Sequence, residues 1–239
     1  MSACPSALAT GQAVPVNFVG HIATGLRAAG DGDDPAFLVG TALPDFASMR
    51  RTRLGPAVGP LADGIALHHA TDHAFHAEGW FLDLERDLRD GLRRDGLPDG
   101  AARACAHVGP ELLLDGALLA DPSIARGVGT VYEGIAAPSD DVVDLVPDHE
   151  REGWRTHLVG VATRLDPFTY GDPAIVAGRL HMITSRRPRL TFDSALVYAV
   201  SARMAAVQPH VAASAREVLD RVSGAVTVTR SRRHWPFRR

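Results

Sequence analysis

The sequence predicts one all-α domain, a helical bundle without a sheet. Apolar residues recur with helical spacing along nearly the whole chain, and prolines and glycines separate these stretches. No linker or internal repeat divides the 239 residues, which are enough to bury a large core without disulfides. Hydrophobic residues at 46% and charged residues at 22% exclude general disorder.

The first half of the chain contains clear helix boundaries. A helix is expected over residues 16–29, before Gly30. Asp34-Pro35 is typical of a helix start, and Pro44 is expected to interrupt that second helix or to start a new turn just before Asp45. After a Gly- and Pro-rich loop over residues 53–60, helices are expected over residues 61–76, 80–94 and 101–120, the last with a kink at Pro110.

The second half continues the pattern after Asp121-Pro122. Helices are expected up to Ile135 and then over residues 150–164, 173–184, 190–207 and 209–222. Residues 226–229 alternate Val and Thr and are compatible with a strand, although four residues cannot make a sheet. We therefore expect a disordered leader over residues 1–15, a helical metal-binding domain over residues 16–223 and a basic tail over residues 224–239.

Charge and cysteine content narrow the possible partners and compartment. The net charge is −3, and the last ten residues carry five arginines and no acid, which favours a solvated end over a nucleic-acid reader. No apolar stretch reaches the length of a membrane span, and the leader lacks the features of a signal peptide. Only Cys4 and Cys105 are present, so the expected location is cytoplasmic.

Histidines and carboxylates follow helical spacing in two places. Among eleven histidines, His68 and His76 flank Asp72 at intervals of four, which places the three on one helix face. The series His107, Glu111 and Asp115 repeats this spacing. Polar residues also interrupt apolar helical segments at two further positions, His21 and Asp45.

Such residues are costly inside a bundle unless they pair or bind metal. A lone buried His or Asp is more often a hydrogen-bonded core residue than a metal ligand. His69 or His73 can equally be solvated, so it stays open which of the histidines at positions 69, 73 and 76 faces inward. Imidazole and carboxylate together suit Mn or Fe, with Zn as a further possibility. The predicted metal ligands are His21, Asp45, His68, Asp72, His76, His107 and Glu111.

The chain resembles the bacterial acyl carrier protein phosphodiesterase family in four segments. They are residues 17–21 (NFVGH), 37–46 (FLVGTALPDF), 64–72 (GIALHHATD) and Met182 followed by 185–190 (SRRPRL). The resemblance implies an HD-domain-like fold, a divalent metal and an acyl carrier protein as partner. It also implies metal-binding or catalytic roles for His21, Asp45, His68 and Asp72.

The chain departs from that family at three positions. Ala23 stands where the family tends to have histidine, and His76 stands where it tends to have aspartate. Glu111 lacks the adjacent histidine of the family's Asp-His pair, although His107 precedes it by one turn. Across these positions carboxylates and imidazoles have thus replaced one another, and the number of possible metal ligands stays similar. This suggests a working metal site with a different substrate or reaction.

Three arginines of the last segment, Arg186, Arg187 and Arg189, can bind phosphate in a bidentate manner or contact an acidic carrier protein. Capping of a helix C-terminus is an equal alternative. The leading hypothesis is a metal-dependent hydrolase that cleaves a phosphopantetheinyl or other small phosphoester, with Asp45, Asp72, Arg186 and Arg187 in catalysis. A di-iron oxygenase and a non-catalytic helical module that binds an acidic partner are the alternatives.

Overall fold

Helices occupy most of the chain that the computed structural model describes, residues 18–30 and 34–232, with side chains up to residue 227. The α-helices are α1 (Phe18–Ala29), α2 (Pro35–Arg50), α3 (Gly59–His76), α4 (Gly79–Arg94), α5 (Asp99–Leu118), α6 (Pro122–Ala136), α7 (Asp140–Val143), α8 (Arg151–Arg164), α9 (Pro173–Ser185) and α10 (Val197–Arg232). Short 3-10 turns are η1 (Asp148–Glu150), η2 (Pro167–Gly171) and η3 (Ser194–Leu196). No strand occurs in these described ranges, which confirms the all-α prediction. The predicted leader lies outside them.

Aspartate followed by proline starts three of these helices. The side chains of Asp34, Asp121 and Asp172 each accept a hydrogen bond from the backbone N–H two residues later. Proline in the next position lacks an N–H that would otherwise be unsatisfied, and its fixed φ suits the first helical turn. The predicted start at Asp34-Pro35 is therefore confirmed.

Two predictions that a helix is interrupted at a proline are wrong. Pro44 lies within α2, which runs on to Arg50 instead of being interrupted. Pro209 lies within α10, which joins the expected helices over residues 190–207 and 209–222 from Val197 onward, whereas residues 190–196 precede α10 and include the 3-10 turn η3. Proline removes a single backbone hydrogen bond, and packing on both sides of it can keep a helix continuous.

The end of the described chain also differs from expectation. Residues 226–229 are helical, so the possible strand there is wrong. The expected boundary between the helical domain and the basic tail, at residues 223 and 224, falls inside α10. Val222 and Val226 are buried one turn apart, and this apolar spacing carries the helix across the expected boundary.

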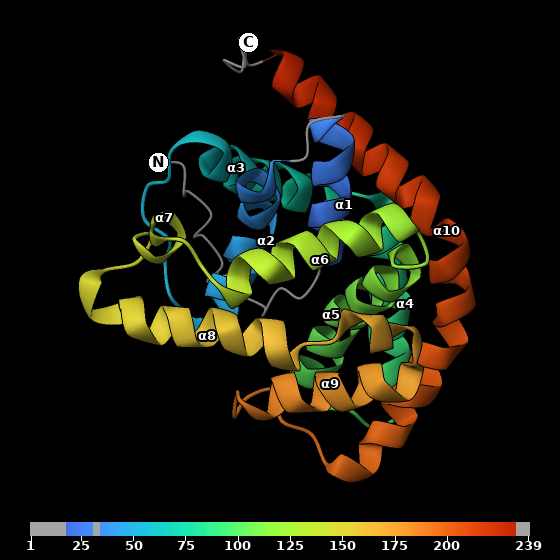
Figure 1. Ribbon diagram of the computed structural model, residues 1–239. Helices are drawn as coiled ribbons and strands as arrows, with labels where there is room; N and C mark the ends of the chain where they lie inside the picture. Colours follow the sequence, from blue (N-terminus) through green and yellow to red (C-terminus); the bar gives the residue numbers. More distant parts are fainter. Residues whose placement is uncertain (1–17, 31–33, 233–239) are drawn as a thin grey trace, which may run out of the picture.

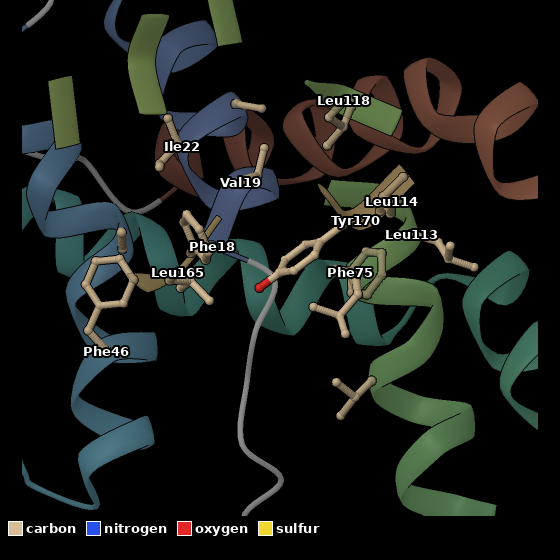
Figure 2. Close-up of a cluster of buried hydrophobic side chains, with 14 of the residues drawn as sticks. Phe18, Val19, Ile22, Phe46, Phe75, Leu113, Leu114, Leu118, Leu165 and Tyr170 are labelled. Atoms are coloured by element: carbon tan, nitrogen blue, oxygen red, sulfur yellow. The ribbon is translucent and has the colours of Figure 1, made fainter. Parts of the chain in front are cut away.

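The long α10 lies along one flank of the bundle, where it packs against α9, α5, α3 and α1 (Figure 1). The core between α1 and α5 is apolar and includes Phe18, Val19, Ile22, Leu113, Leu114 and Leu118 (Figure 2). Burial of these side chains holds α1 in the interior, so a polar residue on α1 such as His21 is buried with them.

Two glycines allow α2 and α3 to approach closely. A Cβ atom at Gly64 would lie 2.9 Å from the Cα of Gly40, and one at Gly40 would lie 3.1 Å from the Cα of Gly64. His68 follows Gly64 by one helical turn, and its Nδ1 lies 2.9 Å from the carbonyl oxygen of Thr41 on α2. The close contact therefore brings the histidine of α3 against the helix that carries Asp45.

Among the described helices, none combines the length and the apolar composition that a membrane crossing requires.

Candidate metal centre

His21, Asp45 and His68 come from three different helices and meet in the interior. One possible ligand atom from each lies within 4.8 Å of the others, and all three side chains are buried. Nε2 of His21 is 3.9 Å from Oδ2 of Asp45, and the ring centroids of the two histidines are 3.9 Å apart. These groups could hold a metal ion, as their residue types predicted.

Several polar atoms of this group have no hydrogen-bond partner among the described residues. They are both carboxylate oxygens of Asp45 and Nδ1 of His21. His68 differs, because its Nδ1 donates to the carbonyl oxygen of Thr41 and its Nε2 then presents a lone pair. Buried polar atoms are rarely left without partners, so these atoms fit a set of ligands better than a set of core hydrogen-bonders.

Burial shifts the pKa values of the group strongly. The pKa of His21 falls well below its usual value because of burial and the nearby His68. Burial likewise lowers the pKa of His68 to about 4. Burial and the neighbouring carboxylates of Glu111 and Asp72 raise the pKa of Asp45 well above its usual range. The two imidazoles are thus neutral at pH 7, the form that binds metal.

A second group lies between α3 and α5. Oε1 of Glu111 is 3.1 Å from Nε2 of His76 and 3.5 Å from Nε2 of His107. The two imidazole rings are parallel, with centroids 4.9 Å apart. Glu111 is buried, and its Oε2 has no partner among the described residues. Nδ1 of His107 lies 3.3 Å from Glu85 on α4, which orients the ring. This group could also hold a metal ion.

Asp72 lies on α3 one turn from His68 and one turn from His76, between the two groups. Its Oδ1 is 3.2 Å from Nδ1 of His76, and its side chain is 44% exposed. Burial alone would lower the pKa of His76, but its hydrogen bonds with Asp72 and Glu111 raise it to about 10. Burial alone would raise the pKa of Asp72, but His76 lowers it, so Asp72 is ionised at pH 7. His68, Asp72 and His76 therefore lie on one face of α3, as their spacing predicted.

The structure settles which of the neighbouring histidines faces inward. His69 and His73 are exposed, whereas His76 is partly buried and contacts Glu111. The main contacts of Asp115 were not predicted from the sequence. Asp115 is buried and accepts the backbone N–H groups of Val19 at 3.2 Å and Gly20 at 3.0 Å, at the start of α1. It therefore caps the helix that carries His21, and no sequence signal indicates this contact across 95 residues.

Arg186 and Arg187 lie apart from both groups in the lining of a pocket. The pocket has a volume of about 540 Å³ and is formed by residues at the C-terminal ends of α2 and α9 and along α8. None of the seven predicted metal ligands lines it. Three further arginines that the sequence did not single out, Arg51, Arg164 and Arg179, line the same pocket. Arg189 is exposed and is not part of the lining.

The four residues that the family resemblance emphasises, His21, Asp45, His68 and Asp72, thus belong to one region of the bundle. An HD-domain-like arrangement and membership of the acyl carrier protein phosphodiesterase family stay predictions. Comparisons of the chain with protein-family models, with curated proteins and with solved structures found no match.

Proposed function

We propose that the protein is a metal-dependent hydrolase that cleaves a phosphoester, with phosphodiesters of the phosphopantetheinyl type as the first candidate substrates. The observation that carries the proposal is the buried convergence of His21, Asp45 and His68, in which both oxygens of Asp45 lack partners among the described residues. A core that needed only packing would not contain this set, because burying such groups without compensation is unfavourable.

The residues fit a divalent cation, with Mn or Fe as the expected ion and Zn as a further possibility. His21, Asp45 and His68 would hold it, and the group of His76, His107 and Glu111 offers a second position. When bound, such an ion supplies Lewis acidity and lowers the pKa of water enough for hydrolysis near neutral pH.

Asp72 is the best candidate for orienting water in this reaction. Its carboxylate is ionised at pH 7 and partly exposed, so it can accept a hydrogen bond from water beside a bound substrate. When no metal occupies the second position, His76, with its pKa of about 10, is protonated at neutral pH and holds the carboxylate of Asp72 in place through the 3.2 Å contact. The carboxylate of Asp45 is more deeply buried and suits ion binding instead.

A di-iron oxygenase is the second candidate. The observation that favours it is that two groups of imidazole and carboxylate lie next to each other, joined by Asp72 on α3. Paired sites of histidine and carboxylate inside helical bundles can hold two iron ions. Anaerobic iron loading followed by addition of oxygen helps to distinguish the candidates, because an oxygenase consumes oxygen during turnover, whereas hydrolysis does not require it.

The decisive experiment uses untagged protein purified without chelators. Elemental analysis gives the bound metal, and metal-free protein reloaded with Mn, Fe, Co or Zn is assayed with bis(4-nitrophenyl) phosphate and with holo-acyl carrier protein. Asp45→Asn should abolish turnover, whereas His73→Gln on the exposed side of α3 should preserve it. Absence of turnover with every metal contradicts hydrolysis, and metal-free protein of full stability favours a non-catalytic module that binds an acidic partner.

A further inference from the structure

The pocket between α2, α8 and α9 has an unusual charge. Five arginines line it, namely Arg51, Arg164, Arg179, Arg186 and Arg187, together with His157 and no carboxylate. The remaining lining is mainly apolar and includes Met49, Val161, Leu165 and Ile183. A volume of about 540 Å³ is within the range of pockets that bind small organic molecules.

The positive charge of this pocket is not neutralised within the described protein. None of the five arginines forms an ion pair with a described carboxylate, whereas Arg86, Arg203 and Arg221 elsewhere on the surface do. Nε of Arg179 is buried without a hydrogen-bond partner among the described residues. Burial and the nearby Arg51 lower the pKa of Arg187. Like charges gathered in this way repel one another, and an anion bound between them would relieve the repulsion.

Arg51 lies at the C-terminal end of α2 and has an unusual backbone conformation. Arg51 is the only non-glycine residue with positive φ, at 63°, in the described ranges. This conformation costs about 1 kcal/mol and is usually left to glycine. This conformation forms the C-terminal cap of α2, in which the N–H of Arg51 donates to the carbonyl oxygens of Ala47 and Ser48, and Arg51 lines the pocket beside that cap.

On α8, Gly160 leaves space for another of the five arginines. A Cβ atom at Gly160 would lie 2.9 Å from Cζ of Arg164, so the absence of a side chain leaves room for that guanidinium against the helix. Both Gly160 and Arg164 line the pocket. Gly160 therefore leaves space for one of the five positive charges to lie along α8.

We propose that this pocket binds a small organic phosphate that carries at least two phosphoryl charges and an apolar body. Planar guanidinium groups bind phosphoryl oxygens in a bidentate manner, and five of them suit more than one phosphoryl group. The side chains of Met49, Val161 and Ile183 offer an apolar surface for the rest of the molecule. Met49 follows Asp45 by one turn of α2, so the pocket begins one helical turn from the candidate metal centre.

Isothermal titration calorimetry with the full chain in EDTA tests the proposal without involving any metal. The probes are inorganic phosphate, pyrophosphate and ATP. Pyrophosphate should bind more tightly than phosphate, and ATP more tightly than pyrophosphate because of the apolar surface. Arg51→Gln and Arg187→Gln should each weaken ATP binding by about tenfold or more, since each removes charge-assisted hydrogen bonds. Arg126→Gln, an exposed arginine on α6, is the matched control and should change nothing.

A second pair of variants changes shape without changing charge. Gly160→Ala displaces the guanidinium of Arg164 and should weaken ATP binding several-fold, whereas Gly178→Ala on α9, where a Cβ meets open space, should not. Absence of ATP binding at about 1 mM, or equal weakening by Arg126→Gln, overturns the proposal. Binding of holo-acyl carrier protein without binding of ATP also overturns it, in favour of a protein-docking surface. Because EDTA is present throughout, failed hydrolysis with retained ATP binding contradicts the proposed function alone.

Discussion

The imidazole rings of His21 and His68 lie with their centroids 3.9 Å apart and their planes at 35°, inside the protein. Burial and the His68 ring make protonation of His21 unfavourable, and the only carboxylate in their group is that of Asp45. A divalent cation would resolve this arrangement, because neutral imidazoles and one carboxylate could all bind it. Metal content should therefore affect folding as well as any reaction.

The first prediction concerns metal removal. Chelation with EDTA should lower the melting temperature, since an ion that binds only the folded state adds about 2.7 kcal/mol of stability at a hundredfold excess over its Kd. For a chain of this size that corresponds to a shift of about 5–10 °C. Differential scanning calorimetry with and without Mn measures the shift.

Two variants test the origin of that shift. His21→Gln removes one ligand and should make the melting temperature insensitive to EDTA, whereas His73→Gln, exposed on α3, should keep the full response. A response to EDTA that survives in His21→Gln would place the ion elsewhere. The second group of three residues would then become the main site.

The second prediction concerns pH in the metal-free protein. The pKa of His68 is about 4 in the folded state against an ordinary value of 6.5, so only the unfolded chain takes up this proton as pH falls between those values. Stability should therefore fall from about pH 6.5 to pH 4, by up to about 3 kcal/mol from this residue. The His76 pKa of about 10 has the opposite effect, and its stabilisation should be lost as pH rises from 6.5 to 10.

Urea midpoints measured in EDTA across this range should show a maximum near neutral pH. His68→Gln should flatten the acidic side of the curve, and His76→Gln should flatten the alkaline side. His149→Gln is the control, because His149 is 81% exposed and contributes to neither group. Unchanged slopes in both variants would show that these histidines do not titrate as described.

Local spacing accounts for the part of the site that the sequence predicted. His68, Asp72 and His76 recur every four residues, and an α-helix places such residues on one face whatever surrounds it. The same reasoning located His107 and Glu111 on one helix. The all-α fold class was predicted from apolar periodicity over the whole chain. That prediction is therefore correct even where the predicted bounds of single helices are wrong.

Contacts between distant segments account for what the sequence left open. The meeting of Glu111 with His76 depends on how α5 packs beside α3, and the N–H groups that Asp115 accepts lie on α1. The continuity of α10 through Pro209 likewise depends on its packing against other helices. Residue types and spacing carry no information on such contacts. For the same reason the sequence indicated only two of the five arginines that line the pocket.

The third prediction concerns the cap of α1. In Asp115→Asn only one side-chain oxygen remains to accept from Val19 and Gly20, so one buried N–H loses its partner. The free energy of unfolding should fall by about 1–3 kcal/mol. Metal affinity should fall as well, because His21 directly follows Gly20. Urea denaturation and metal titration measure the two effects.

Asp121→Asn is the matched control for that variant. Asp121 caps α6 at the surface, and asparagine caps a helix about as well as aspartate, so stability and metal affinity should stay unchanged. If Asp115→Asn loses metal affinity while its stability is unaffected, Asp115 interacts with the ion and is more than a cap.

The last prediction concerns the close contact between α2 and α3. Gly64→Ala would place a Cβ atom 2.9 Å from the Cα of Gly40, against backbone that cannot rotate away. The two helices must then separate, which strains the core and moves His68 away from Asp45. We expect a loss of about 2–4 kcal/mol in stability and a large loss of metal affinity.

Gly129→Ala on α6 separates this effect from helix propensity. A Cβ at Gly129 meets open space, so alanine there should stabilise the protein by about 0.5–1 kcal/mol and leave metal affinity unchanged. If Gly64→Ala also stabilises the protein, α2 and α3 do not pack as closely as described. If instead it destabilises the protein but keeps full metal affinity, the position of His68 relative to Asp45 does not control ion binding.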